Sequence, residues 1–236
     1  MRRHTALSLF FLIGCTSTDT DSGTDANDDT LVVEQVTWDL SLEEYLSNEP
    51  LQGATLTVGD STFVTDDQGS ADLLVDGNSD IMVNMTQDGF PEAHFYRFMG
   101  PDGWIAVRKI PSNDTIALLA AALGLEPDPS KGILLGIISL ACTPTDDPND
   151  CAFLSGITID IDANYDVALA DDRTQPTGLS VSNVSIDSAV SFANVAPGPI
   201  SLPLTPPEGY SCDYVHSSIE VFADHYQEVT LFCPPN

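Results

Sequence analysis

The sequence predicts an all-β protein made of two tandem antiparallel β-sandwiches, joined by a connector that contains one short α-helix. From residue 31 onward, short runs of alternating apolar and polar residues lie between Gly, Asn, Asp and Pro, which is typical of strands and tight turns. One segment has the periodicity of a helix instead, and similar short sequence motifs occur before and after it. The predicted parts are a first sandwich at 31–111, a helix and linker at 112–131 and a second sandwich at 132–236.

The first fourteen residues have the features of a cleaved signal peptide. Arg2 and Arg3 give a positive start, and the apolar core from Ala6 to Ile13 is too short to span a bilayer, which takes about 20 apolar residues. The core ends in Leu12-Ile13-Gly14-Cys15, which resembles the lipobox of bacterial lipoproteins. That resemblance implies lipidation of Cys15 and a membrane anchor. The alternative is an ordinary signal peptide with a chance cysteine.

Residues 15–30 consist of Cys15 and the polar segment TSTDTDSGTDANDDT, which has no apolar periodicity. Such a composition predicts a disordered acidic linker between the lipid and the folded chain. Thr16 follows the cysteine, and in lipoproteins of Gram-negative bacteria a residue other than Asp there implies sorting to the outer membrane. We therefore expect a lipid-anchored protein of the cell envelope, in the outer membrane if the host is Gram-negative.

The charge of the chain excludes one class of partner. The formal net charge is −29, and removal of residues 1–14 leaves five basic residues against 36 acidic ones. Nucleic acids are bound through Lys and Arg that neutralise phosphates, so nucleic-acid binding is excluded. Acidity of this kind keeps an exported domain soluble or gathers cations.

The predicted strands alternate between an apolar and a polar face. They include ATLTV (54–58), IMVNM (81–85), GITIDID (156–162), ISLPL (200–204) and SIEVF (218–222). In both halves of the chain apolar and polar residues therefore alternate with a period of two, which predicts sheets with one buried face.

The predicted helix lies in PSNDTIALLAAALGLEPDP, between the two halves. Ile116, Leu119, Ala120 and Leu123 fall on one helical face. Asn113 or Asp114 can cap its start, and Gly124 is placed to end it in the left-handed conformation. The segment that follows, up to residue 131, is predicted to be a linker.

Four cysteines remain once Cys15 is set aside: Cys142, Cys151, Cys212 and Cys233. An even number in an exported protein predicts disulfides, with three possible connectivities. We favour Cys142–Cys151 and Cys212–Cys233 because each pair flanks a plausible loop or hairpin. The alternative of a zinc site needs a tighter Cys-x-x-Cys spacing.

A longer stretch, PLQGATLTVGDSTFVTDDQGSADLLVDGNSDIMVNMTQDGF, resembles the carboxypeptidase regulatory-like family, whose fold is a transthyretin-like, immunoglobulin-like sandwich. In the second half GITIDID, SFANVAPG and EGYSC resemble the same pattern. The resemblance covers just over half of the chain. It implies two related sandwiches and a non-catalytic accessory or adhesive role on an exported protein.

A basic and aromatic segment, HFYRFMGPDGWIAVRKIP, is a candidate binding surface. The turn at Gly100-Pro101-Asp102-Gly103 predicts a hairpin that pairs Phe98 with Ile105 and Tyr96 with Val107. The other face of that hairpin carries the candidate binding residues Phe95, Arg97 and Arg108, and Lys109 follows them. The alternative is a plain hairpin whose arginines pair with neighbouring acids.

Two candidate metal sites follow from the acidic and histidine residues. Asp160, Asp162, Asn164 and Asp166 have the every-second-residue oxygen spacing of a calcium loop, although the EF-hand glycine and glutamate are missing. His216 and His225, with Asp213 and Asp224 nearby, suit a transition metal instead. The alternative in both cases is exposed strand and turn positions.

The sequence contains no Gly-x-Ser-x-Gly elbow, His-Glu-x-x-His motif or phosphate-binding loop. We therefore expect no catalytic residues and no required cofactor, with Ca²⁺ as an option. The predicted function is that of a non-catalytic, lipid-anchored binding or structural module with an unknown protein or glycan partner. The alternatives are a metal-assisted hydrolase at His216/His225 and a calcium-stabilised adhesin.

Overall fold

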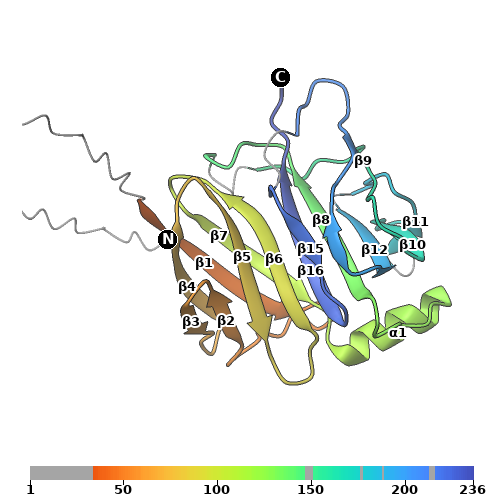
Figure 1. The fold of residues 1–236 in the computed structure, drawn as a ribbon, viewed down its shortest axis with the longest axis horizontal. Coiled ribbons are helices and arrows are strands. Elements are labelled where there is room, and N and C mark those ends of the chain that lie inside the picture. The colour runs from red at the N-terminus through yellow and green to blue at the C-terminus, as the bar shows by residue number, and fades with distance from the viewer. Residues whose placement is uncertain (1–33, 147–150, 176–177, 188, 213–215) are drawn as a thin grey trace, which may run out of the picture. The chain divides into compact units, whose positions relative to one another are not determined.

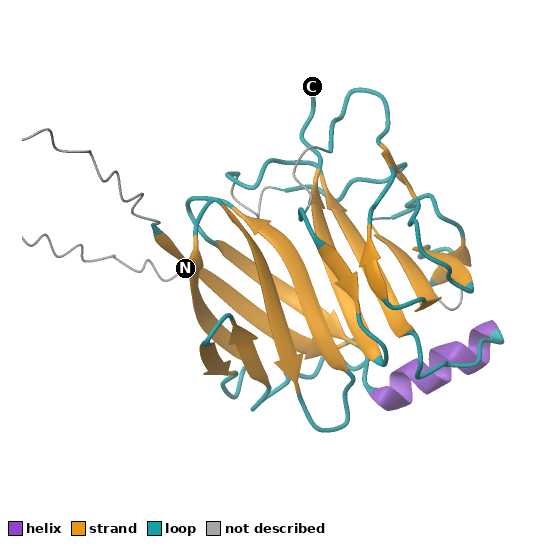
Figure 2. Cartoon of the chain, viewed as in Figure 1, coloured by secondary structure: helices purple, strands orange, loops and turns teal. Residues whose placement is uncertain are grey.

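The computed structural model describes residues 34–146, 151–175, 178–187, 189–212 and 216–236, and it confirms an all-β fold with one helix (Figures 1 and 2). The predicted signal peptide, Cys15 and the acidic linker lie outside the described residues. The elements in chain order are β1 (Gln35–Glu44), β2 (Thr55–Val58), β3 (Ser61–Val64), β4 (Ser70–Asp76), β5 (Ser79–Thr86), β6 (Glu92–Met99), β7 (Trp104–Ile110), α1 (Asn113–Leu123), β8 (Gly132–Leu140), β9 (Thr158–Ile159), β10 (Val167–Asp171), β11 (Leu179–Val181), β12 (Ala189–Val195), β13 (Gly198–Ile200), β14 (Leu204–Thr205), β15 (Ile219–Val221) and β16 (His225–Phe232).

A nine-stranded sheet runs through both halves of the chain, in the order β11-β10-β12-β8-β16-β6-β5-β2-β3. The last strand, β16, lies between the halves and pairs in parallel with β6 and with β8, so that Val229 is opposite both Tyr96 and Ile137. The predicted boundaries at 31–111 and 132–236 therefore do not separate the strands into two sheets. Parallel pairing was not predicted, because alternation has the same period in parallel and antiparallel strands.

Two hydrophobic cores lie on opposite faces of this main sheet. On one face, Trp38, Leu40 and Leu73 of the smaller sheet, in the order β4-β1-β7, pack against the first half of the main sheet. On the other face, Phe192 and Val229 belong to a second core, which short strands of the C-terminal half cover. The main sheet thus contributes one face to each core, which explains why β16 is buried on both faces from Tyr226 to Phe232.

The turn at Gly100–Gly103 does not form the predicted hairpin. β6 lies in the main sheet, and β7 lies in the smaller sheet, parallel to β1. Gly103 has a positive φ of 76°, and a Cβ there would collide with the carbonyl of Thr37. The turn therefore carries the chain from one sheet to the facing sheet, a route that turn residues alone do not distinguish from a hairpin.

Helix α1 begins and ends in defined caps. The Ser112 hydroxyl accepts a hydrogen bond from the Thr115 N–H at 3.2 Å, so Ser112, and not Asn113 or Asp114, is the N-cap. Gly124 adopts the predicted left-handed conformation, with φ of 68°. The Thr115 hydroxyl donates to Glu44 at the end of β1, 2.7 Å away, which holds the start of the helix on the first half of the chain.

The two favoured disulfides are confirmed. Cys142 is bonded to Cys151 and Cys212 to Cys233. Cys142 is buried in the first core and Cys233 in the second. Each cross-link therefore fastens a loop of the second half to one of the two cores.

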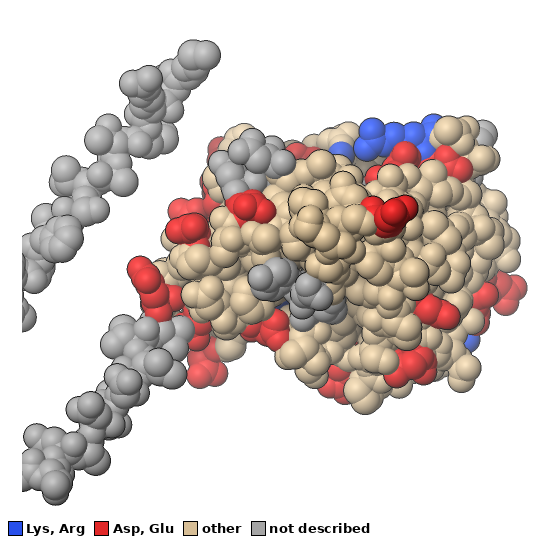
Figure 3. All heavy atoms as spheres, turned by 90° about the horizontal axis from the view of Figure 1, so that it is seen from above, with Lys and Arg blue, Asp and Glu red and all other residues tan. Residues whose placement is uncertain are grey.

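The surface carries the acidity that the composition predicts. Asp and Glu side chains are scattered over the face drawn in Figure 3, whereas Lys and Arg atoms are visible only at its edges, mainly the upper one. No helix in the described part of the chain is long and apolar enough to cross a membrane.

Candidate functional site

A cavity of about 440 Å³ lies between α1 and the second half of the main sheet, on the face that also carries the first core. Figure 1 shows α1 running beside the ends of β8 and β12. The lining is mainly apolar and includes Ile116, Leu119, Leu123, Leu134 and Ile138. Its volume is in the range of small-molecule sites, which is roughly 300 to 1,000 Å³.

The helical wall of the cavity is the apolar face predicted from the sequence. Ile116, Leu119, Ala120 and Leu123 all line the cavity. Of these, Ala120 is buried, while the three larger side chains are only half-buried. The apolar face of α1 is therefore directed at the sheet without being packed against it.

Small residues form the floor of the cavity. Gly136 of β8 is opposite Ser191 of β12 on one side and Glu228 of β16 on the other. A Cβ on Gly136 would find its nearest neighbours at ordinary contact distances, 3.6 Å from the Ser191 Oγ and 3.7 Å from the Tyr226 Oη. The glycine therefore leaves room for at least one methyl group, and a side chain there would project into the cavity.

A buried ion pair lies at one end of the cavity. The Nε of Arg108 is 2.6 Å from the Oε1 of Glu228, and the two side chains are 9% and 5% exposed. Arg108 also donates to the Thr230 hydroxyl at 3.1 Å, and the Tyr226 hydroxyl lies 3.4 Å from the other carboxylate oxygen of Glu228. Within the described chain neither the Nε nor the Oε1 has a well-aligned hydrogen bond, and both atoms are buried.

Burial sets the ionisation of these groups. It raises the pKa of the Glu228 carboxyl, and the Arg108 guanidinium offsets part of that rise. Burial and the nearby Glu228 carboxylate also raise the pKa of Tyr226. At neutral pH the tyrosine is therefore a neutral hydroxyl, which can donate or accept a hydrogen bond.

The mouth of the cavity combines apolar and charged side chains. Val107 and Phe153 are 52% and 60% exposed there. Asp171 and Arg173 also line this region, and burial together with the Asp187 charge raises the pKa of Asp171. Exposed apolar groups at a cavity mouth favour the entry of an apolar ligand.

The four predicted binding residues do not form a common surface. Phe95 and Arg97 are 2% and 1% exposed and lie between the two sheets. The guanidinium of Arg97 stacks on Trp104 inside the core, 3.1 Å from the ring centroid. Only Arg108 and Lys109 reach the cavity, and the prediction of a docking surface on this segment is wrong because the predicted hairpin does not form.

The structure does not gather the predicted calcium residues around one point. The carboxylate of Asp162 accepts hydrogen bonds from Ser201, and that of Asp166 is engaged by Lys131 and Asn194. Among the described residues, the carboxylates of Asp160, Asp162 and Asp166 do not form a group close enough to hold one ion. Asn164 belongs to the same turn, and calcium binding there remains a prediction.

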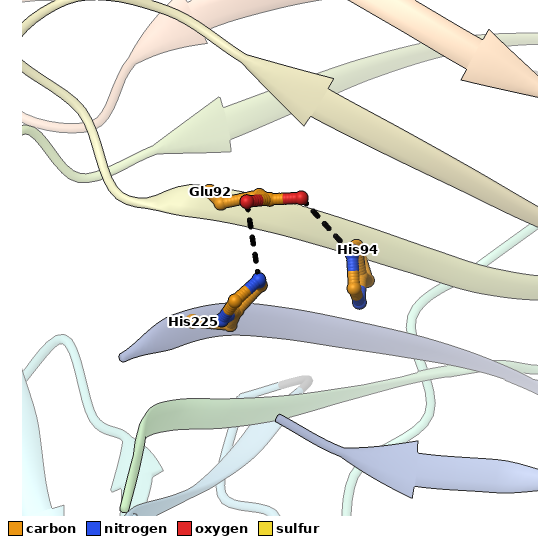
Figure 4. A group of neighbouring side chains, drawn as sticks. All are labelled: Glu92, His94 and His225. Atoms are coloured by element: carbon orange, nitrogen blue, oxygen red, sulfur yellow. Dashed lines mark ion pairs between the residues drawn. The ribbon is translucent and has the colours of Figure 1, made fainter. Parts of the chain in front are cut away.

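The predicted histidine site is divided, and the structure gives His225 other neighbours. His216 packs edge-on against Tyr96, with ring centroids 5.0 Å apart, and Asp213 lies outside the described residues. Asp224 is not among the neighbours of His225 that could share a metal; Glu92 and His94 of β6 are (Figure 4). Sequence reasoning missed these two residues because they lie in the other half of the chain.

No protein-family model matches the chain, and no curated protein matches it. Solved structures with similarity include the minor pilin GBS52 of the gram-positive pathogen Streptococcus agalactiae, at 10% identity and a TM-score of 0.32, covering 86% of this chain and 96% of that chain. The shaft pilin SpaA of Lactobacillus rhamnosus GG is similar at 12% identity and a TM-score of 0.26, covering 86% and 98%. Likeness at this level carries no information about function.

Proposed function

We propose that this chain is a non-catalytic, lipid-anchored binding module of the cell envelope, whose ligand is a small, uncharged and mainly apolar molecule with one hydrogen-bonding group. The observation that carries the proposal is the cavity of about 440 Å³ beneath α1. A helix whose apolar face is only half-buried leaves hydrophobic surface for a ligand to cover. Burial of such surface contributes roughly 25 cal/mol per Å².

The polar end of the cavity supports a ligand without net charge. Arg108 and Glu228 are already paired, so their charges offset one another. An anionic ligand would also have to approach a protein with 36 acidic residues. The hydroxyl of Tyr226, which lines the cavity, is the group placed to hydrogen-bond a hydroxyl, carbonyl or amide.

The anchoring part of the proposal rests on the N-terminal sequence. The lipobox-like Leu12–Cys15 and the acidic segment after it favour a tether that holds the domain near a membrane, where apolar ligands are concentrated. Mass spectrometry of the mature N-terminal peptide tests this part by itself. Acyl chains on Cys15 support it, and a bare thiol or cleavage at another bond contradicts it.

Binding of an uncharged fluorescent probe tests the cavity. N-phenyl-1-naphthylamine fluoresces in apolar surroundings, and we expect saturable binding at one site of the wild-type protein. Gly136→Leu places four carbons in the cavity and should weaken binding at least tenfold. Leu118→Ala is the matched control, because Leu118 is on α1 but 60% exposed and outside the cavity. Equal binding by wild type and Gly136→Leu would contradict the proposal.

A further inference from the structure

One carboxylate and two imidazoles meet at the junction of β6 and β16, on the opposite face of the main sheet from the cavity. Glu92 and His94 are two residues apart on β6 and therefore share a face. His225 begins β16 and is directly opposite Glu92 in the parallel register. Strand pairing between the two halves of the chain thus brings the three side chains together, as Figure 4 shows.

The distances between the three side chains suit a single small ion. The Nε2 of His225 is 3.3 Å from one carboxylate oxygen of Glu92, and the Nε2 of His94 is 3.8 Å from the other. One potential ligand atom from each residue lies within 4.8 Å of the others. Two ligands of a tetrahedral zinc ion, each about 2.1 Å from the metal, lie about 3.4 Å apart. A small inward movement is enough to bring all three to bonding distance.

Neighbouring groups fix the orientation of the ligand atoms. The Nδ1 of His225 is 2.6 Å from the carbonyl oxygen of Ala223, which can only accept, so Nδ1 carries the proton. Asn84 donates to Glu92 at 2.8 Å. Phe222 packs edge-on against the ring of His94, with centroids 4.7 Å apart. A histidine held by a backbone carbonyl through one nitrogen, with the other nitrogen free to bind, is the usual arrangement of a metal ligand.

In that tautomer the unprotonated Nε2 of His225 faces a carboxylate oxygen of Glu92, and both atoms can only accept a hydrogen bond. A neutral imidazole and a carboxylate would then place two lone pairs 3.3 Å apart, which is unfavourable unless a proton or a metal ion lies between them. His94 is 5% exposed, and its Nε2, 3.8 Å from the Glu92 carboxylate, is the nitrogen turned toward the cluster. The cluster therefore has capacity for a cation that its protein neighbours do not satisfy.

We propose that Glu92, His94 and His225 bind one divalent transition-metal ion of the zinc class, with water completing the coordination, and that the ion fastens β6 of the first half to β16 of the second. Two imidazoles and one carboxylate favour zinc, copper or nickel over calcium or magnesium, which prefer oxygen ligands. The side chain of Glu92 is 40% exposed, so the site is open to solvent on that side and an ion can enter.

Titration of the chelator-treated full-length protein with ZnCl₂ in a calorimeter tests the proposal. We expect one Zn²⁺ ion per chain, no competition for that site from CaCl₂ or MgCl₂, and a melting temperature that rises with Zn²⁺. His225→Gln and His94→Gln should each weaken zinc binding at least tenfold and remove the thermal shift. His216→Gln is the matched control, because that histidine is nearby but outside the cluster.

A second readout keeps the test decisive if a variant folds poorly. The visible absorption of Co²⁺ bound in place of zinc reports nitrogen and oxygen ligands in the unmodified protein, and far-UV circular dichroism checks that each variant folds. The site is supported if wild type gives the spectrum of tetrahedral Co²⁺ and the Glu92→Gln variant, although folded, does not. The proposal would be overturned if wild type showed no saturable Zn²⁺ binding. It would also be overturned if folded His225→Gln still bound Zn²⁺ while His216→Gln did not.

Discussion

Arg108 of β7 and Glu228 of β16 approach to 2.6 Å across the space between the two sheets, and both side chains are almost fully buried. Arg108 belongs to the first half of the chain and Glu228 to the last strand. The pair therefore links the smaller sheet to the strand on which the main sheet is centred. It also forms the polar end of the cavity, so one contact connects the fold to the proposed site.

Removal of one member of this pair should be strongly destabilising. Arg108→Met leaves the Glu228 carboxylate buried without a cation, and we expect the free energy of unfolding to fall by about 3 to 5 kcal/mol. The double variant Arg108→Met/Glu228→Leu should recover most of that loss, because no charge is then left unpaired. Urea unfolding of wild type, Arg108→Met, Glu228→Leu and the double variant measures the coupling. A double variant as unstable as Arg108→Met would show that packing, and not charge, dominates.

The raised pKa of Glu228 predicts a pH dependence. Burial raises this pKa above its ordinary value of 4.5, with Arg108 offsetting part of the rise. The folded state then binds more protons than the unfolded state, so this group's contribution to stability falls as pH rises from 4.5 through the raised pKa. Arg108→Met should steepen that fall, and Glu228→Gln should abolish it. Unfolding measured between pH 5 and 8 checks both; an unchanged slope in Glu228→Gln would contradict the assignment.

Two glycines of β8 should respond oppositely to the same substitution. At Gly136 a methyl group meets nothing closer than 3.6 Å, whereas at Gly132 it would lie 2.6 Å from the Cγ1 of Val221. Gly136→Ala should therefore raise the free energy of unfolding by about 0.5 to 1 kcal/mol, and Gly132→Ala should lower it. Thermal unfolding compares the two. Destabilisation by Gly136→Ala would mean that the space on the cavity floor is not as described.

Arg97 should tolerate an apolar replacement better than another cation. Its guanidinium is 3.1 Å from the Trp104 ring centroid and 5.5 Å from that of Trp38, and burial together with the charge of Arg108 lowers its pKa. Lys cannot stack as a planar group and is more strongly hydrated. Arg97→Lys should therefore lower the urea midpoint more than Arg97→Met. The reverse order would show that a positive charge is required between the two tryptophans.

Glu44 should stabilise the contact between α1 and β1 only at a pH where its carboxyl group is ionised. Partial burial opposes the shift, but hydrogen bonds from Thr115, Ser47 and Leu46 lower the pKa of Glu44 from 4.5 to about 2. The unfolded state then binds more protons between these values, so stability falls as pH falls from 4.5 to 2. Glu44→Gln should remove that part of the acid sensitivity, and Glu49→Gln, at an exposed position, should not. Equal acid profiles for wild type and Glu44→Gln would exclude the role.

The sequence indicated those features whose cause is local. Alternation identified β2, β5 and β15, but only Thr158 and Ile159 of GITIDID form a strand and residues 201–203 of ISLPL form none. The residues from Ile116 to Leu123 identified the apolar face of α1, and short spacing favoured the observed disulfides. Each depends on residues within about twenty positions of one another. The lining of the cavity and the Glu92–His94–His225 cluster depend on β16 entering between β6 and β8. No local pattern specifies that pairing, and for the same reason the hairpin at Gly100–Gly103 was predicted wrongly.

A nuclear magnetic resonance measurement tests the cavity most directly. With ¹³C-labelled Ile and Leu methyl groups and bound N-phenyl-1-naphthylamine, we predict intermolecular nuclear Overhauser effects to Ile116, Leu119, Leu123, Leu134 and Ile138, which line the cavity. The same spectrum should show none to Leu118 on the outer side of α1. Contacts to Leu118 or to methyl groups of the second core, without contacts to the cavity methyls, would contradict the account.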